Sequence, residues 1–210
     1  MTDNEYMRVL HAQDYQTKPW KNGQGTTRDI LLSPEAEDFD IRVSLADIPR
    51  ESTFSAFPGI TRHITLLAGD AMTLAFADGN AEHLRPMVPL TFDSGQTPFC
   101  QASAGTVRVL NVMARATAWQ SSVAALAQGR HRAEIPAGGA ILLFAALGRW
   151  TAQAGSSTAD CAEGETALAA GSAAVNLSGS LGAKALLATL TPTIRTDETP
   201  FGFFKANATN

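Results

Sequence analysis

The stretch "FDIRVSLADI", residues 39–48, alternates apolar and polar side chains. A period of two places successive side chains on opposite faces of a β-strand. One face carries the four residues Phe39, Ile41, Val43 and Leu45. The other face carries the four residues Asp40, Arg42, Ser44 and Ala46. The stretch therefore predicts a β-strand with one apolar and one mainly polar face.

The same pattern recurs along the chain. "HITLLAGDAMTLAF" (residues 63–76) predicts two strands joined at a Gly-Asp turn, and "ADGN" (77–80) is a hairpin signal. "GTVRVLNVMAR" (105–115) alternates again, and one of its faces carries Val107, Val109, Asn111 and Met113. "SSVAALAQGR" (121–130) is rich in alanine, but we assign it to a strand because its neighbours favour strands. Short strands separated by turn residues are typical of an all-β sandwich or barrel.

A weak internal repeat divides the chain. "LLAGDAMTLAFADG" (residues 66–79) resembles "LLFAALGRWTAQAG" (142–155) in its pattern of strand, glycine turn and strand. Repetition of one pattern indicates duplication of one structural unit. We therefore expect two β-barrel halves, residues 1–115 and residues 116–210, and the second half carries few polar candidates for a site.

Composition excludes several classes of protein. The chain has 210 residues, 45% of them hydrophobic and 17% charged, with a net charge of −4, so neither a nucleic-acid-binding surface nor a polyanion partner is expected. No apolar run reaches the roughly 20 residues of a membrane helix, and the start of the sequence lacks a secretory signal. Cys100 and Cys161 leave a disulfide open, but two lone thiols suit a reducing compartment better. We expect a cytoplasmic protein that uses no membrane.

The histidines do not form a metal-binding pattern. The four of them, His11, His63, His83 and His131, are isolated from one another. Zinc and iron sites need several nitrogen or carboxylate ligands that converge, so we expect no metal and no other cofactor. His63 is expected at an exposed or edge position. The sequence also lacks the motifs of serine hydrolases, P-loop proteins and dinucleotide-binding enzymes.

Four motifs in order resemble the HutD/Ves family. They are "PWKNGQGTTRDI" (residues 19–30), "FDIRVSLADI", "FSAFPGITRHITLLAG" (54–69) and "VRVLNVMAR" (107–115), and the resemblance covers roughly residues 8–190. That family consists of bacterial cupin-fold proteins associated with histidine utilisation. The glycine run usual after the asparagine is Gly23-Gln24-Gly25 in this chain.

The resemblance implies a bicupin: two antiparallel jelly-roll barrels in one chain, the first with the better-formed cavity. Residues 1–115 would then be the barrel that holds a ligand, and residues 116–210 a degenerate barrel with a tail. The resemblance also implies a regulatory role, in which the protein binds an intermediate of histidine breakdown and limits the flux of the pathway.

Eight residues are candidates for binding such a ligand. Lys21 and Arg62 are suited to hold a carboxylate, and the amides of Asn22 and Asn111 can both donate and accept hydrogen bonds. An unpaired amide among the apolar neighbours of Asn111 would cost about 1–3 kcal/mol if that face is buried. The remaining candidates are Trp20 and Phe57 as an apolar wall, and Arg42 and Ser44 if the polar face of their strand looks into a barrel.

Each candidate also has a structural interpretation. Asn22-Gly23 is a common hairpin turn, in which Lys21 would simply be solvated. Trp20 could equally belong to the core, and Arg42 could pair with Asp29 or Asp40 as a surface contact worth about 0–1 kcal/mol.

Three functions are compatible with these residues. The leading hypothesis is a metal-independent protein that senses a small anionic metabolite such as urocanate or formylglutamate. The second is a metal-free cupin isomerase or epimerase with Lys21 as a base. The third is a protein–protein regulatory module, and a homodimer is compatible with an edge-rich β protein.

Overall fold

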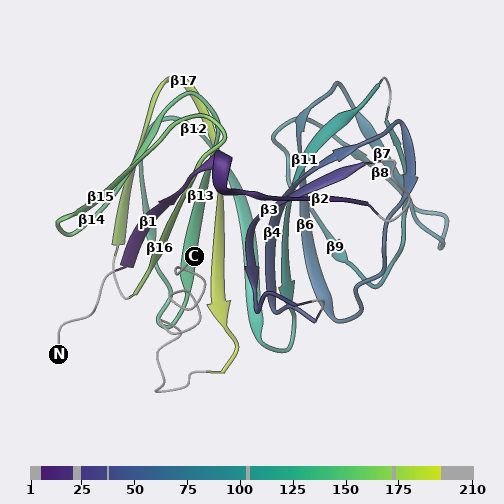
Figure 1. Cartoon of the computed structure of the whole chain (residues 1–210), viewed down its shortest axis with the longest axis horizontal. Helices are drawn as coiled ribbons and strands as arrows, with labels where there is room; N and C mark the ends of the chain where they lie inside the picture. Colours follow the sequence, from purple (N-terminus) through teal and green to yellow (C-terminus); the bar gives the residue numbers. More distant parts are fainter. Residues whose placement is uncertain (1–5, 21–24, 37, 103–104, 172–173, 195–210) are drawn as a thin grey trace. The chain divides into compact units, whose positions relative to one another are not determined.

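The chain folds into two compact units, described here from a computed structural model. The structure describes residues 6–20, 25–36, 38–102, 105–171 and 174–194. The N-terminal unit comprises Tyr15–Thr117, and the C-terminal unit comprises Met1–Asp14 together with Ala118–Asn210. Strands dominate both units, and the described part of the chain contains no helix long and apolar enough to cross a membrane (Figure 1).

The N-terminal unit is built from two antiparallel sheets. One has the order β2-β3-β4-β11-β6-β9, and the other has the order β5-β10-β7-β8. The strands of the first sheet are β2 (Gln16–Pro19), β3 (Thr26–Ser33), β4 (Ile41–Ile48), β6 (Ile60–Ala68), β9 (Leu90–Asp93) and β11 (Val107–Arg115). Those of the second are β5 (Glu51–Thr53), β7 (Met72–Ala75), β8 (Ala81–Leu84) and β10 (Phe99–Ala102).

One hydrophobic core joins the two sheets of the N-terminal unit. Ala46, Leu66 and Val109 contribute from the first sheet, and Leu74 and Cys100 from the second. Side chains alternate along a strand, so residues two positions apart share a face. Because Ala46 faces this core, Ser44 and Arg42 of β4 face it too. The polar face of residues 39–48 therefore looks into the unit, as a strand in a ligand-binding barrel can do.

The opposite face of β4 is buried as well. Ile41, Val43 and Leu45 are at most 5% exposed. A strand covered on both faces can carry polar side chains only where partners for them exist. The partners of the polar residues of β4, or the lack of them, therefore show where the interior has polar groups left to satisfy.

The C-terminal unit has the strand order β1-β16-β13-β17-β14-β15, and β12 also pairs with β17. Its strands are β1 (Tyr6–Leu10), β12 (Trp119–Glu134), β13 (Ala140–Leu147), β14 (Trp150–Ala154), β15 (Ser157–Cys161), β16 (Thr166–Ala170) and β17 (Ala174–Pro192). A single turn of 3₁₀ helix, η1 (Ala12–Asp14), follows β1. The strand assigned to residues 121–130 is confirmed, since it lies within β12.

The N-terminal strand departs from the expected division of the chain at residue 115. β1 pairs with β16 along five residues, from Tyr6 opposite Ala170 to Leu10 opposite Thr166. Met7 and Val9 also pack against the hydrophobic core of the C-terminal unit. Backbone pairing and side-chain burial thus place the start of the chain with residues 118–210 rather than with the half that follows it in sequence.

The two units share a pairing plan. β11 pairs with β4 and β6 in the first unit, and the corresponding part of β17 pairs with β12 and β13 in the second. β7 and β8 form a hairpin, as "ADGN" predicts, and so do β14 and β15. Gly69 after β6 and Gly148 after β13 both have positive φ, +104° and +72°. The predicted turn at Gly69 joins two strands that belong to different sheets, because β6 pairs with β11 and β9.

The two cysteines are separate thiols, so the disulfide left open by the sequence is not formed. Cys100 lies in the core of the N-terminal unit and Cys161 in that of the C-terminal unit, and both are at most 2% exposed. Burial raises the pKa of Cys100 to about 11 and the pKa of Cys161 to about 12. Both side chains therefore behave as small hydrophobic residues.

Candidate functional site

Four of the predicted site residues lie together inside the N-terminal unit. On the central strand β11, Asn111 is opposite Ser44 of β4, and Met113 is opposite both Arg42 of β4 and Arg62 of β6. Residues directly opposite each other on neighbouring strands point to the same face of a sheet. Arg42, Ser44, Arg62 and Asn111 consequently share the inward face, next to the core.

Arg62 is a buried cation surrounded by aromatic rings. It is 6% exposed, and its guanidinium carbon lies 5.2, 5.6 and 5.7 Å from the ring centres of Phe54, Phe57 and Phe92. Within the described part of the chain no carboxylate forms an ion pair with it, and its Nε has no hydrogen-bond partner. Burial, followed by the positive charge of Arg42, lowers the pKa of the Arg62 guanidinium to about 9.

Arg42, by contrast, is neutralised. Its Nε donates a hydrogen bond to Asp29 Oδ1 at 2.7 Å, and Lys18 Nζ lies 3.2 Å from Asp29 Oδ2. The ion pair expected with Asp29 or Asp40 is thus formed with Asp29, whereas Asp40 pairs with Arg115. Asp29 is only 5% exposed, so this is not the surface contact that we considered for Arg42. One carboxylate already serves two cations, which leaves Arg62 uncompensated.

Two further buried polar atoms of the N-terminal unit lack partners among the described residues. Asn111 is 7% exposed and its Oδ1 accepts no hydrogen bond from the described residues. Ser94 is fully buried, two residues after Phe92, and its Oγ is likewise without a described partner. Each such atom costs about 1–3 kcal/mol when it is left unpaired. The cost predicted for an unpaired Asn111 from the sequence therefore applies in this structure.

Trp20 has a structural role. Its Nε1 donates a hydrogen bond to Thr27 Oγ1 at 2.9 Å, and its ring packs against the core. A Cβ on Gly25 would lie 2.9 Å from that ring, so the glycine leaves room for the indole. The core interpretation of Trp20 therefore accounts for its contacts. Lys21 and Asn22 lie outside the described residues.

Phe57 lies at the surface end of this cluster. It lines a depression of about 280 Å3, here called the Phe57 depression. Its lining residues are Asp38, Phe39, Ala56, Phe57, Pro58, Ile60 and Arg115. The rings of Phe39 and Phe57 are 5.5 Å apart, and Phe39 also lies 6.0 Å from the Arg42 guanidinium. Both rings thus line the depression and also lie close to an arginine of the inward face, Phe39 to Arg42 and Phe57 to Arg62.

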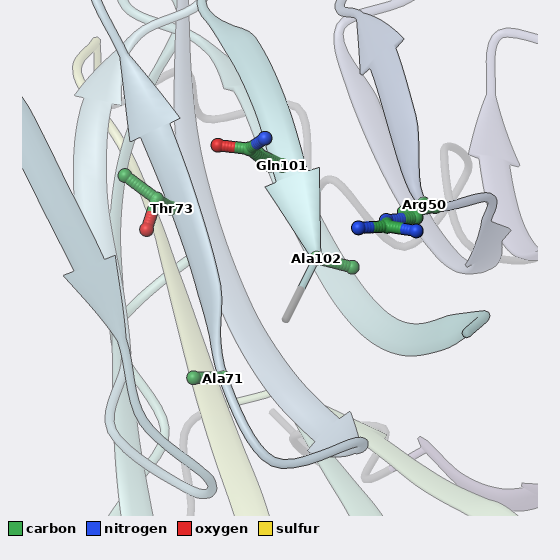
Figure 2. Close-up of a pocket in the computed structure, with 5 residues that line it drawn as sticks. All are labelled: Arg50, Ala71, Thr73, Gln101 and Ala102. Atoms are coloured by element: carbon green, nitrogen blue, oxygen red, sulfur yellow. The ribbon is translucent and has the colours of Figure 1, made fainter. Parts of the chain in front are cut away.

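A second depression of about 200 Å3 lies on the sheet that contains β7 and β10 (Figure 2). Arg50, Ala71, Thr73, Gln101 and Ala102 line it, and Figure 2 shows the Arg50 guanidinium set apart from the side chains of Thr73 and Gln101. Thr73 is hydrogen-bonded to His83, and Gln101 to Glu51. The lining of this second depression includes none of the predicted site residues and none of the residues whose buried polar atoms lack described partners.

The expectation that His63 is exposed or at an edge is wrong. It is 5% exposed, and its strand β6 is flanked by β11 and β9. Its Nδ1 lies 2.8 Å from Thr91 Oγ1, which gives the buried imidazole a hydrogen bond. Among the described residues, no three His, Cys, Asp or Glu side chains gather where they could hold a metal ion.

Comparison with known proteins connects this fold to one family. The HutD family model matches residues 12–187. An uncharacterized 21.2 kDa protein in the hutC 3′ region of Pseudomonas putida is 38% identical over 109 residues, which are 51% of this chain and 57% of that relative. The chain thus matches little more than half the length of that curated relative.

Solved structures agree with this assignment. A conserved protein of unknown function from Pseudomonas aeruginosa PAO1 has a TM-score of 0.83 at 25% identity, covering 89% of this chain and 99% of its own. HutD from Pseudomonas fluorescens SBW25, solved in a formate condition, has a TM-score of 0.78 at 25% identity, covering 90% and 100%. A cupin 2 conserved barrel protein from Leptotrichia buccalis, 13% identical with a TM-score of 0.55 over 87% and 96%, shares the cupin fold.

Proposed function

This chain belongs to the HutD family, and from that premise we propose that it is a metal-independent binding protein for a small carboxylate. The ligand occupies the inward face of the N-terminal unit, and its binding regulates histidine utilisation in the cytoplasm. The protein acts as a sensor rather than as an enzyme.

In this proposal the two units are two cupin barrels, the second a degenerate copy of the first. The shared pairing plan of β4, β6 and β11 with β12, β13 and β17 supports a duplication. The hydrophobic core of the C-terminal unit consists mainly of alanine side chains such as Ala152, with larger apolar residues such as Leu177 and Trp150. Side chains of this kind fill a barrel and offer no charge to a ligand.

The observation that carries the proposal is the unpaired charge of Arg62. Burial of a cation without a counter-ion is costly, because several kcal/mol of hydration are lost and no ion pair replaces them. The three surrounding rings offset part of that cost through cation–π attraction. A carboxylate bound to the Arg62 guanidinium would supply the missing negative charge and accept charge-assisted hydrogen bonds from it.

The unpartnered Asn111 Oδ1 and Ser94 Oγ indicate what else the ligand carries. An amide oxygen only accepts hydrogen bonds, so Asn111 calls for an N–H or O–H group. A serine hydroxyl can donate or accept. The site therefore suits a carboxylate that also bears a hydrogen-bond donor, as urocanate and formylglutamate do.

The link with histidine utilisation comes from relatives. HutD of P. fluorescens carries the family name, and the P. putida relative is named for its place beside hutC. A protein that binds an intermediate of the pathway can report its concentration and limit the flux. This role requires binding but no turnover.

Calorimetric titration of the full chain with urocanate, formylglutamate and formate tests the proposal. We expect saturable binding of at least one of them, weakened about 10- to 150-fold by Arg62→Met, since a charged hydrogen bond contributes about 1.5–3 kcal/mol. Arg108→Met is the matched control, because Arg108 is 46% exposed and pairs with Asp47 on the same sheet. Absence of binding at millimolar concentrations, or equal binding by Arg62→Met, would refute the proposal.

A further inference from the structure

Arg62 is closed off from solvent, although the proposed function requires an anion to reach it. Phe54, Phe57 and Phe92 surround its guanidinium, and only 6% of the residue is exposed. Access to the guanidinium therefore depends on the movement of a neighbouring side chain.

Of these three rings, Phe57 also lines a surface hollow described above. Phe57 forms part of the Phe57 depression, whereas Phe54 and Phe92 do not. Phe57 and Phe92 are both half-buried, whereas Phe54 is 8% exposed and packs within the core of the unit. Phe57 is thus the ring that both lines the depression and lies against the guanidinium, 5.6 Å from its ring centre.

The depression itself does not retain an anion. Its one cation, Arg115, is bonded to Asp40 Oδ1 at 2.7 Å, to the Phe39 carbonyl oxygen at 2.8 Å and to the Asp38 carboxylate. Two carboxylates outnumber this guanidinium, so the local charge is net negative and does not hold an anion there. The unpaired charge of Arg62 lies beyond the Phe57 ring that lines this depression.

We propose that the Phe57 side chain is a gate through which a small anion passes from the Phe57 depression to Arg62. This inference rests on the proposed function for its biological purpose, but the geometry of the gate stands on its own contacts. The neighbouring ring of Phe39 is 3% exposed, and the Phe39 carbonyl is bonded to Arg115, so Phe39 forms the fixed side of the gate.

Only the side chain of Phe57 moves in this gate, because its backbone is anchored. The Phe57 N–H donates a hydrogen bond to the Ser94 carbonyl at 2.7 Å, and the Ile60 N–H donates one to the Phe57 carbonyl at 3.2 Å. The Phe54 N–H is bonded to the Pro98 carbonyl at 3.1 Å. A change of the Phe57 χ1 rotamer turns the ring toward the depression without breaking any of these bonds.

The gate can be tested without a ligand. Methylglyoxal is a small arginine-specific reagent, and peptide mass spectrometry measures its modification of Arg62 and of the exposed Arg108 in one sample. We expect Phe57→Ala to accelerate modification of Arg62 by at least about tenfold relative to Arg108, because reaction at a closed site is limited by the population of its open form. Phe57→Trp should slow it.

Phe54→Ala is the matched control. It also removes a ring from Arg62 but opens nothing toward the depression, so the rate at Arg62 should change by less than about twofold. Phe57→Leu is made alongside Phe57→Ala, and the thermal midpoint of each variant shows that it is folded. Equal rates in the wild type and the folded Phe57 variants, or equal acceleration by Phe54→Ala, would overturn the gate.

The two proposals fail in different ways. Accelerated modification with no carboxylate binding by calorimetry retains the gate and refutes the binding function. Carboxylate binding that depends on Arg62, with no acceleration in Phe57→Ala, retains the binding function and refutes the gate.

Discussion

Arg42 and Arg62 lie on the same face of one sheet, each opposite Met113, yet only Arg42 has a carboxylate partner. Like charges at such positions repel each other, and Asp29 offsets only one of them. The sheet therefore holds a positive charge that the described residues leave unbalanced. This asymmetry leads to the first two predictions.

Replacement of Arg62 by methionine should stabilise the ligand-free protein. Methionine fills a similar space without a buried charge, so we expect the free energy of unfolding at neutral pH to rise by about 1–3 kcal/mol. Urea unfolding monitored by circular dichroism measures the change. Arg108→Met, at an exposed ion pair, should alter stability by less than about 1 kcal/mol. A loss of stability in Arg62→Met would contradict the view of Arg62 as an unsatisfied cation.

The same variant predicts a dependence on pH. Burial lowers the pKa of Arg62 to about 9 in the folded protein, below the pKa of a guanidinium in the unfolded chain. At pH values between these two pKa values the unfolded chain binds more protons, so stability rises with pH. The advantage of Arg62→Met over wild type should thus be complete at about pH 7.5 and smaller at about pH 10. The quantity to compare is the difference in unfolding free energy between Arg62→Met and wild type at each pH, because the titration of all other groups cancels in it.

Loss of the Asp29 charge should be destabilising. In Asp29→Asn, Arg42 and Lys18 lose their shared counter-ion, and we expect a cost of about 2–3 kcal/mol, reduced from that of a fully buried pair because Lys18 is half exposed. Asp47→Asn is the control, since Asp47 is 27% exposed, and it should cost less than about 1 kcal/mol. Chemical unfolding measures the loss of stability in both variants. Equal losses would show that the Asp29 charge contributes no more to stability than an exposed ion pair does.

Gly25 should not tolerate a side chain. A Cβ there would lie 2.8 Å from the Asp47 carbonyl oxygen and 2.9 Å from the Trp20 ring, so Gly25→Ala should cost about 1–3 kcal/mol and shift the NMR signal of the Trp20 indole N–H. Gly79→Ala has open space around its Cβ and only a positive φ of +90° to accommodate. It should leave the indole signal unchanged, and an unchanged signal in Gly25→Ala would mean that the indole does not pack on the glycine.

The sequence predicts the strands of this fold better than it predicts their partners. Alternation in residues 39–48 and 105–115 identifies β4 and β11, because period two is a local property of the chain. The pairing of β1 with β16 joins residues about 160 positions apart in sequence, and no local pattern encodes it. His63 illustrates the same limit, since its burial follows from β9, which arrives later in the chain.

The sequence points to only some of the residues of the candidate site, for the same reason. Asn111 stands out in the sequence as an amide among apolar neighbours, and Arg62 as a guanidinium suited to donate hydrogen bonds to a carboxylate. The rings of Phe54 and Phe92 around Arg62 were missed, because their approach depends on β6, β9 and the segment before β6 coming together. Ser94 was missed too, since "DSG" has the sequence of an ordinary turn and gives no sign that its hydroxyl is buried.

The pairing of β1 with β16 has a consequence for synthesis on the ribosome. Tyr6–Leu10 leaves the exit tunnel before the N-terminal unit does, but its partner Thr166–Ala170 is translated only after the whole of that unit has been made. The nascent chain must therefore keep this short strand unpaired while the N-terminal unit is synthesised. A split protein cut after Thr117 would separate the strand from its seat, and only co-expression of both fragments could restore it.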